Sequence, residues 1–206
     1  MQKIGTLAQQ ALRALRSRMN HAQRATRPNP NQNPSKAKNP TPKPLLKLQA
    51  PEHFATQTWR NQQTRADLQG VCPVLLKWAR SFQREAKAHG VPIFILEGKR
   101  TPERQFSLYQ QGFSQIPYDG SHVRGYALDI IHATRFWDGM QKEDWQTLAY
   151  LGKEIASRQG LPLTWGGDWK RYYDAAHWEV TGWRSKPPIT TLSEIADQHL
   201  RTNSLI

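Results

Sequence analysis

Four residues, at two places in the sequence, have the types and spacing that catalysis at a metal ion needs. His122, Asp129 and His177 supply two imidazoles and a carboxylate, a ligand set that suits zinc. Three protein ligands leave a fourth position open for water, as in catalytic rather than structural zinc sites. Asp174 stands three residues before His177, where a carboxylate can serve as acid and base. These residues predict a metallohydrolase with one Zn²⁺ ion per chain.

Strand periodicity is expected to place the candidate groups on shared faces. Residues 126–131 read as a strand in which Asp129 lies on the face opposite the large apolar side chains. In another predicted strand, residues 175–180, His177 and Glu179 lie on the same face. Glu179 can therefore hydrogen-bond the His177 imidazole and orient it toward the metal ion. His132 follows Asp129 closely, but its parity puts it on the opposite face. We therefore interpret His132 as structural.

The elements needed to hold these groups are helices mixed with short strands, without regular alternation of strand and helix. The pattern predicts an α+β fold with a small antiparallel sheet, flanking helices and a single catalytic zinc site, preceded by a disordered basic tail. Pro73 is expected to kink or restart the first helix. The predicted helices are 64–88, 101–111 and 142–158, and the predicted strands are 93–96, 126–131, 161–165 and 175–180.

Charge divides the chain into two parts, 1–50 and 51–206. The whole chain has a formal charge of +13, and the first part contains ten Lys or Arg residues, no Asp or Glu, and no aromatic residue. Such a segment cannot bury enough apolar surface to offset its conformational entropy, so it is expected to be largely disordered. The second part contains all eight Trp residues and is expected to form the catalytic domain. A single cysteine, Cys72, leaves histidine and carboxylate as the ligand pool.

The basic tail allows more than one interpretation. Residues 3–19 have helical apolar spacing with Lys and Arg opposite, which is typical of a helix on an anionic membrane surface or of a solvated tail. Residues 28–44 contain six prolines and predict an extended linker. No stretch has the roughly 20 apolar residues of a membrane span. Arginines interrupt the apolar run that a signal peptide needs, so we expect a cytoplasmic protein as synthesised.

Four segments resemble the zinc peptidases that cut D-amino-acid peptides of bacterial cell walls. SHVRGYALD resembles the family motif H-x-x-G-x-A-x-D, and DAAHWE resembles D/E-x-x-H-x-E. EGKRTPERQFSLYQQG resembles the segment R-T-x-x-x-Q, and WGGDW is similar to a loop of the lysin branch. The family includes D-Ala-D-Ala carboxypeptidases and dipeptidases of the VanY/VanX type and L-alanyl-D-glutamate endopeptidases of phage lysins.

The resemblance implies a role for each matched residue. Metal ligation falls on His122, Asp129 and His177, acid and base catalysis on Asp174, and oxyanion binding on Arg100. The alternative for Arg100 is an ordinary surface ion pair with Glu103. The residues expected to contact substrate or support the site are Glu179, Gln105 and Ser121. One departure concerns Gly120, which stands where the family commonly has Ser.

The implied function is hydrolysis of peptidoglycan stem peptides, as an L-Ala-D-Glu endopeptidase of a phage or prophage endolysin. A D-Ala-D-Ala carboxypeptidase of the same family is the first alternative. A non-catalytic zinc-containing module with a polyanion-binding tail is the second. We expect a monomer that acts in the cell wall or periplasm after release. Residues 1–20 are expected to bind anionic membrane or lipopolysaccharide, and no motif for specific nucleic-acid binding is present.

Overall fold

The computed structural model describes residues 43–190, and its elements fall in two units, 1–48 and 49–206, that are described separately. In the first unit, α2 (Lys43–Leu46) is a single helical turn. The predicted basic helix and nearly all of the predicted linker lie outside the described residues. The division into a disordered tail and a catalytic domain stays a prediction.

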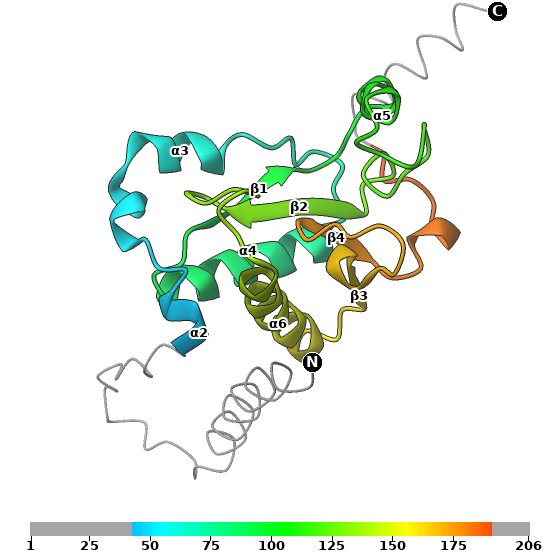
Figure 1. Cartoon of the computed structure of the whole chain (residues 1–206). Helices are drawn as coiled ribbons and strands as arrows, with labels where there is room; N and C mark the ends of the chain where they lie inside the picture. The colour runs from blue at the N-terminus through cyan, green and yellow to red at the C-terminus, as the bar shows by residue number, and fades with distance from the viewer. Residues whose placement is uncertain (1–42, 191–206) are drawn as a thin grey trace, which may run out of the picture. The chain divides into compact units, whose positions relative to one another are not determined.

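The second unit is an α+β fold around one antiparallel sheet, as the sequence predicts (Figure 1). The sheet has four strands in the order β1-β2-β4-β3. Its strands are β1 (Ile93–Glu97), β2 (Ala127–His132), β3 (Leu163–Trp165) and β4 (His177–Val180). The helices are α3 (Gln57–Gln63), α4 (Pro73–Ala88), α5 (Pro102–Gln110) and α6 (Lys142–Arg158), with 3₁₀ turns η1 (Pro51–Ala55), η2 (Gly166–Asp168) and η3 (Trp183–Ser185). No helix of residues 43–190 combines the length and apolarity that a bilayer crossing requires.

Helices α5 and α6 begin where the sequence predicts. The helix predicted to begin at residue 64 instead begins at Pro73. The side chain of Thr101 accepts a hydrogen bond from the backbone N–H of Arg104 and caps α5, with Pro102 in the first turn. Helix α6 has the predicted bounds. Helix α4 begins at Pro73, because the residue before a proline is driven to extended geometry and Cys72 has ψ 121°. The predicted helical residues 64–72 instead form turns.

Large aromatic side chains cover one face of the sheet. Trp178 of β4 pairs with Leu128 of β2 across the ladder, and both are buried. Ring centroids lie 4.9 Å apart for Trp78 and Trp178, and 5.8 Å apart for Phe82 and Trp178. The indole N–H of Trp78 donates to the carbonyl of Gly152 in α6 at 2.9 Å. Helices α4 and α6 therefore pack on this face (Figure 1), and the opposite face is left for polar groups.

Candidate metal centre

The three predicted ligands meet at one point on the open face of the sheet. His122 Nε2 lies 3.2 Å from Asp129 Oδ1 and 3.2 Å from His177 Nδ1, and the last two atoms lie 3.3 Å apart. The ligand atoms of a tetrahedral zinc ion, with bonds of about 2.0–2.1 Å, lie about 3.3–3.4 Å from one another. The spacing and the chemistry of this donor set thus fit a zinc ion with an open fourth position.

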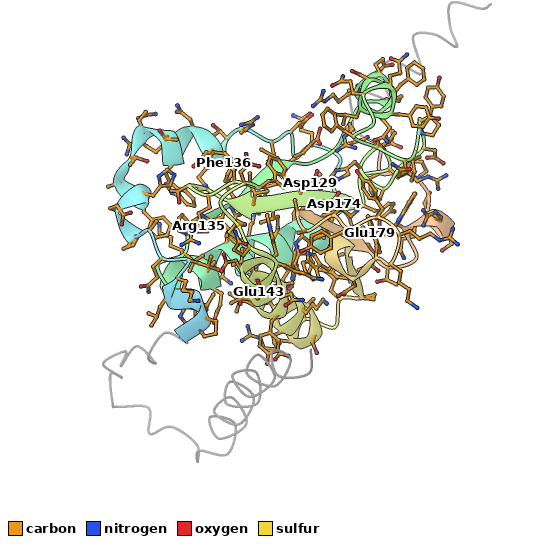
Figure 2. All side chains as sticks on the ribbon, in the orientation of Figure 1. Asp129, Arg135, Phe136, Glu143, Asp174 and Glu179 are labelled. Carbon is orange, nitrogen blue, oxygen red and sulfur yellow. The ribbon has the colours of Figure 1, made fainter. Side chains whose placement is uncertain are left out.

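Sheet register brings two of these ligands together. Asp129 of β2 and His177 of β4 are direct partners in the antiparallel ladder, so their side chains leave the same face side by side. Ala127 occupies the corresponding place opposite Glu179 and is small enough to leave space above the sheet. In Figure 2 the labelled Asp129, Asp174 and Glu179 lie at the end of the sheet where β2 and β4 meet.

The third ligand comes from a tight turn before β2. The backbone N–H of Gly125 donates to the carbonyl of His122 at 3.1 Å, and that of Tyr126 donates to Ser121 at 2.8 Å. Gly125 has φ +80°, a left-handed conformation that favours glycine. A Cβ at this position would also lie 2.0 Å from the carbonyl oxygen of Gly70. The reversal that returns His122 over Asp129 therefore requires glycine here.

Gly125→Ala is expected to lower the free energy of unfolding by about 3 kcal/mol, since the strained φ contributes about 1 kcal/mol and the collision with a carbonyl the rest. Gly160→Ala is the matched control, because Gly160 has φ +63° but open space around it, and a loss of about 1 kcal/mol is expected. Urea unfolding of both variants measures the difference. Equal losses would show that the close approach at Gly125 is unimportant.

Both imidazoles have their second nitrogen engaged, which fixes the atom that faces the ligand position. His122 Nδ1 donates to the carbonyl of Gly98 at 2.8 Å. His177 Nε2 donates to Glu179 Oε2 at 3.2 Å, with Ser121 Oγ 3.4 Å away. With these nitrogens protonated, His122 Nε2 and His177 Nδ1 each have a lone pair that can coordinate a metal ion. Glu179 and Ser121 thus contact the nitrogen of His177 that faces away from the candidate metal position.

The charged groups at the candidate centre shift one another's pKa values. Burial raises the pKa of Asp129, but the two imidazoles outweigh this and hold that pKa well below its usual range. Burial lowers the pKa of His177, whereas hydrogen bonds to Asp129 and Glu179 raise it, and the net result is a pKa of about 9. In the metal-free protein, protonated His177 therefore partly compensates the carboxylates around it.

Asp174 lines the same cleft, at the end of the loop that joins η2 to β4. Its backbone N–H donates to the carbonyl of Gly166 at 3.2 Å, and a Cβ on Gly166 would lie 2.4 Å from the Asp174 carbonyl oxygen. Burial, and then the nearby charge of Asp129, raise the pKa of Asp174. A half-buried carboxyl with a raised pKa is suited to accept and return a proton near neutral pH.

Arg100 is a half-buried partner of the candidate centre rather than a surface residue paired with Glu103. Its side chain is only 10% exposed, and its Nη2 forms an ion pair with Glu97 and lies 3.6 Å from Asp129 Oδ2. Its Nη1 donates to Gln105 Oε1 at 2.7 Å. Gln105 is 2% exposed and also donates from Nε2 to the carbonyl of Ile116. Gln105 is therefore placed to hold Arg100 in position.

Sequence reasoning did not assign Glu97, Gly98 or Trp169 to the site. The register of β1 shifts between Ile95 and Glu97, so that Glu97 faces Asp129 and forms an ion pair with Arg100. The Trp169 ring lies 5.0 Å from that of His177. The sequence contains one indication of these residues: Glu97 is a charged residue at the end of a strand predicted to be buried. His132, by contrast, is buried outside the site, where its Nδ1 accepts the backbone N–H of Arg135 at 3.3 Å.

The candidate metal centre lies in a cleft of about 1260 Å³. Its walls combine the triad, Asp174 and Arg100 with exposed aromatic side chains, among them Trp137 and Tyr173. A His–Asp–His triad with a carboxyl and an arginine in an open cleft is typical of a metal-dependent hydrolase.

Comparisons with known proteins name the class more closely. Residues 119–180, which include all three metal-ligand candidates and Asp174, match the family model described as D-alanyl-D-alanine carboxypeptidase. The peptidoglycan L-alanyl-D-glutamate endopeptidase CwlK of Bacillus subtilis is 27% identical over 148 residues, which are 62% of this chain and 85% of CwlK. The L-alanyl-D-glutamate peptidase of Listeria phage A118 is 30% identical over 102 residues, 48% of this chain and 34% of that protein.

A solved structure agrees with these sequence matches. The L-Ala D-Glu endopeptidase ChiX of Serratia marcescens superimposes with a TM-score of 0.51 and 27% sequence identity, over 61% of this chain and 92% of ChiX. The resemblance predicted from the motifs is therefore confirmed. The chain is a metallopeptidase that is similar to D-alanyl-D-alanine carboxypeptidases over residues 119–180 and to L-alanyl-D-glutamate endopeptidases over about 60% of its length.

Proposed function

We propose that the chain is a zinc-dependent endopeptidase that hydrolyses the L-alanyl-D-glutamate bond in peptidoglycan stem peptides. The observation that carries this proposal is the ligand triangle of His122, Asp129 and His177, with Asp174 in the same cleft. The bond is taken from CwlK, the phage peptidase and ChiX, whose names all specify it.

In the proposed mechanism His122, Asp129 and His177 hold the ion. When bound, a zinc ion lowers the pKa of a coordinated water toward neutrality and makes a nucleophile available near pH 7. Asp174 accepts a proton from the attacking water and returns it to the nitrogen of the leaving amine. Attack on the scissile carbonyl builds negative charge on its oxygen. The guanidinium of Arg100, beside Asp129, offsets that charge, a contribution often worth about 3–4 kcal/mol per donor.

A D-Ala-D-Ala carboxypeptidase is the second candidate, because the matching family model has that description. An exopeptidase of this type needs a closed pocket for the terminal carboxylate of its substrate. The cleft here, at about 1260 Å³, is larger than the roughly 300–1,000 Å³ of most small-molecule pockets and suits a longer chain. Cleavage within the stem peptide is therefore the better supported activity.

The proposed setting is that of a phage or prophage lysin. The monomeric enzyme would act in the cell wall after release, and residues 1–20 would hold it at anionic lipid or lipopolysaccharide. Support for this setting comes from the phage relative and from the positive charge of residues 1–50.

Digestion of purified peptidoglycan tests the proposed bond. The zinc-loaded protein is expected to release fragments with a new amino-terminal glutamate, identified by mass spectrometry. The His122→Ala variant, prepared in parallel, controls for contaminating hydrolases because it lacks one ligand. Release of free D-alanine without new glutamate termini would instead establish the carboxypeptidase, and the absence of any new terminus would exclude both activities.

A further inference from the structure

An arginine that the mechanism does not use lies on the cleft wall, directly after the strand of the metal ligand. Arg184 belongs to η3, which follows β4, and both Trp183 and Arg184 line the cleft. The guanidinium carbon of Arg184 lies 4.5 Å from the centre of the Trp183 ring, and Trp183 itself is buried. A guanidinium stacked on an aromatic ring keeps its N–H edge available for an anion.

Hydrogen bonds join the backbone of Arg184 to the turn that contains His122. Arg124 Nη1 donates to the carbonyl of Arg184 at 3.3 Å, and Arg124 is in turn held by Asp119 through its Nε at 2.7 Å. The Tyr126 hydroxyl donates to the carbonyl of Pro187 at 2.8 Å. In Figure 1 the orange segment after β4 accordingly lies beside the green loop before β2. Arg184 is thus attached to a fixed wall, which lowers the entropy lost on binding a ligand.

Two other arginines that line the cleft, Arg100 and Arg104, already have a carboxylate partner. Arg100 is paired with Glu97 and hydrogen-bonded to Gln105, and Arg104 Nε lies 3.8 Å from the same Glu97. Within residues 43–190, no carboxylate forms an ion pair with Arg184. Arg184 interacts electrostatically with Glu179 but forms no ion pair with it, so its guanidinium can bind a carboxylate from outside the protein without first breaking an ion pair.

The proposed substrate presents such a carboxylate next to the scissile bond. A glutamate whose nitrogen is acylated by alanine has two carboxyl groups, and only one of them can continue the peptide. The other remains an anion, two or four covalent bonds from the scissile nitrogen, or within about 3–6 Å. When the bond lies at the metal centre, this carboxylate must lie in the cleft.

We propose that Arg184, stacked on Trp183, binds the free carboxylate of the substrate glutamate and thereby determines specificity for an acidic residue after the scissile bond. This inference rests on the proposed endopeptidase function. The planar guanidinium matches a carboxylate through two parallel hydrogen bonds, and such charge-assisted pairs are stronger than neutral ones. A substrate in which this carboxylate has been converted to a carboxamide loses both the charge and one acceptor.

Two stem peptides that differ only at this group, carboxylate or carboxamide, test the inference. The wild-type enzyme is expected to show a kcat/KM about 10- to 100-fold higher for the carboxylate peptide. In Arg184→Gln this ratio is expected to fall to about one, and Arg184→Lys is expected to keep part of it because the charge remains. Arg80→Gln removes an exposed charge outside the cleft and is expected to keep the wild-type ratio.

The outcomes separate this inference from the function on which it rests. If the wild-type enzyme cleaves neither peptide, the endopeptidase proposal fails. If it cleaves both equally, or if Arg184→Gln keeps the preference, only the role of Arg184 is overturned. Arg65 and Lys142 also line the cleft, so loss of the ratio in Arg65→Gln or Lys142→Gln, but not in Arg184→Gln, would reassign the carboxylate to that residue.

Discussion

Asp174→Asn is expected to lower kcat by about 10³- to 10⁴-fold while the protein still binds one zinc ion per chain. The amide keeps the size of the side chain but can neither accept the proton of the attacking water nor return it to the leaving amine. Metal binding should persist because the three ligand atoms belong to His122, Asp129 and His177. Steady-state kinetics together with metal analysis of the purified variant measure both quantities.

Two further variants make the assignment to Asp174 specific. Asp138→Asn removes an exposed carboxylate outside the cleft and is expected to leave kcat within about twofold of wild type. Glu179→Gln is expected to weaken metal binding by about 10- to 100-fold, because Glu179 orients His177. If Asp174→Asn stays active while Glu179→Gln is inactive with its metal bound, Glu179 is the base and Asp174 is not.

The groups on the open face of the sheet could be predicted because side-chain direction in a strand follows from parity alone. Alternation in β2 and β4 places Asp129, His177 and Glu179 on one face and Trp178 on the other, as observed. Helix α6 has the predicted bounds because its apolar residues recur at helical spacing over four turns. Both signals depend on local spacing, and the tertiary structure preserves them in these elements.

Two contacts that support the site could not be predicted in the same way. The carbonyl of Gly98, which fixes the tautomer of His122, is a backbone group without a sequence signal. The partner of Arg100 is Glu97 rather than Glu103, because a register shift in β1 places Glu97 opposite Asp129 and the capped start of α5 keeps Glu103 at the surface. Three-dimensional register, rather than residue type, decided these pairs.

The start of α4 shows how a local signal can mislead. Leu68 and Val71 continue the helical spacing of the residues after Pro73, yet residues 64–72 form turns. The backbone N–H of Cys72 donates to the carbonyl of Gly125 at 2.8 Å, so this segment instead supports the turn of His122. Apolar residues at helical spacing indicate which side chains are buried, not that the backbone is helical. Leu68 and Val71 pack against the rest of the protein as part of a loop.

Removal of the metal ion is expected to abolish hydrolysis and to make folding stability fall as the pH rises from about 6.5 to about 9. In the metal-free folded protein the pKa of His177 is raised from 6.5 to about 9 by its carboxylate partners. The folded state therefore holds this proton more tightly than the unfolded state. The protonated His177 therefore adds up to about 3 kcal/mol to the free energy of unfolding. This contribution is fully present below pH 6.5 and is lost as the pH rises through 9. Asp129 has its pKa lowered, so its contribution is lost only in acid.

The zinc-loaded protein is expected to show the opposite slope over the same range. A ligand imidazole must be neutral, so zinc competes with the proton on His177 and its apparent affinity rises as the pH increases. Stability gained from binding rises with affinity, because the ion binds the folded state in preference to the unfolded one. Urea unfolding at pH 6, 7.5 and 9, with chelator or with zinc, distinguishes the two slopes. His177→Gln is expected to make the metal-free profile flat above pH 6.5, and a slope that persists in this variant would assign the effect to another group.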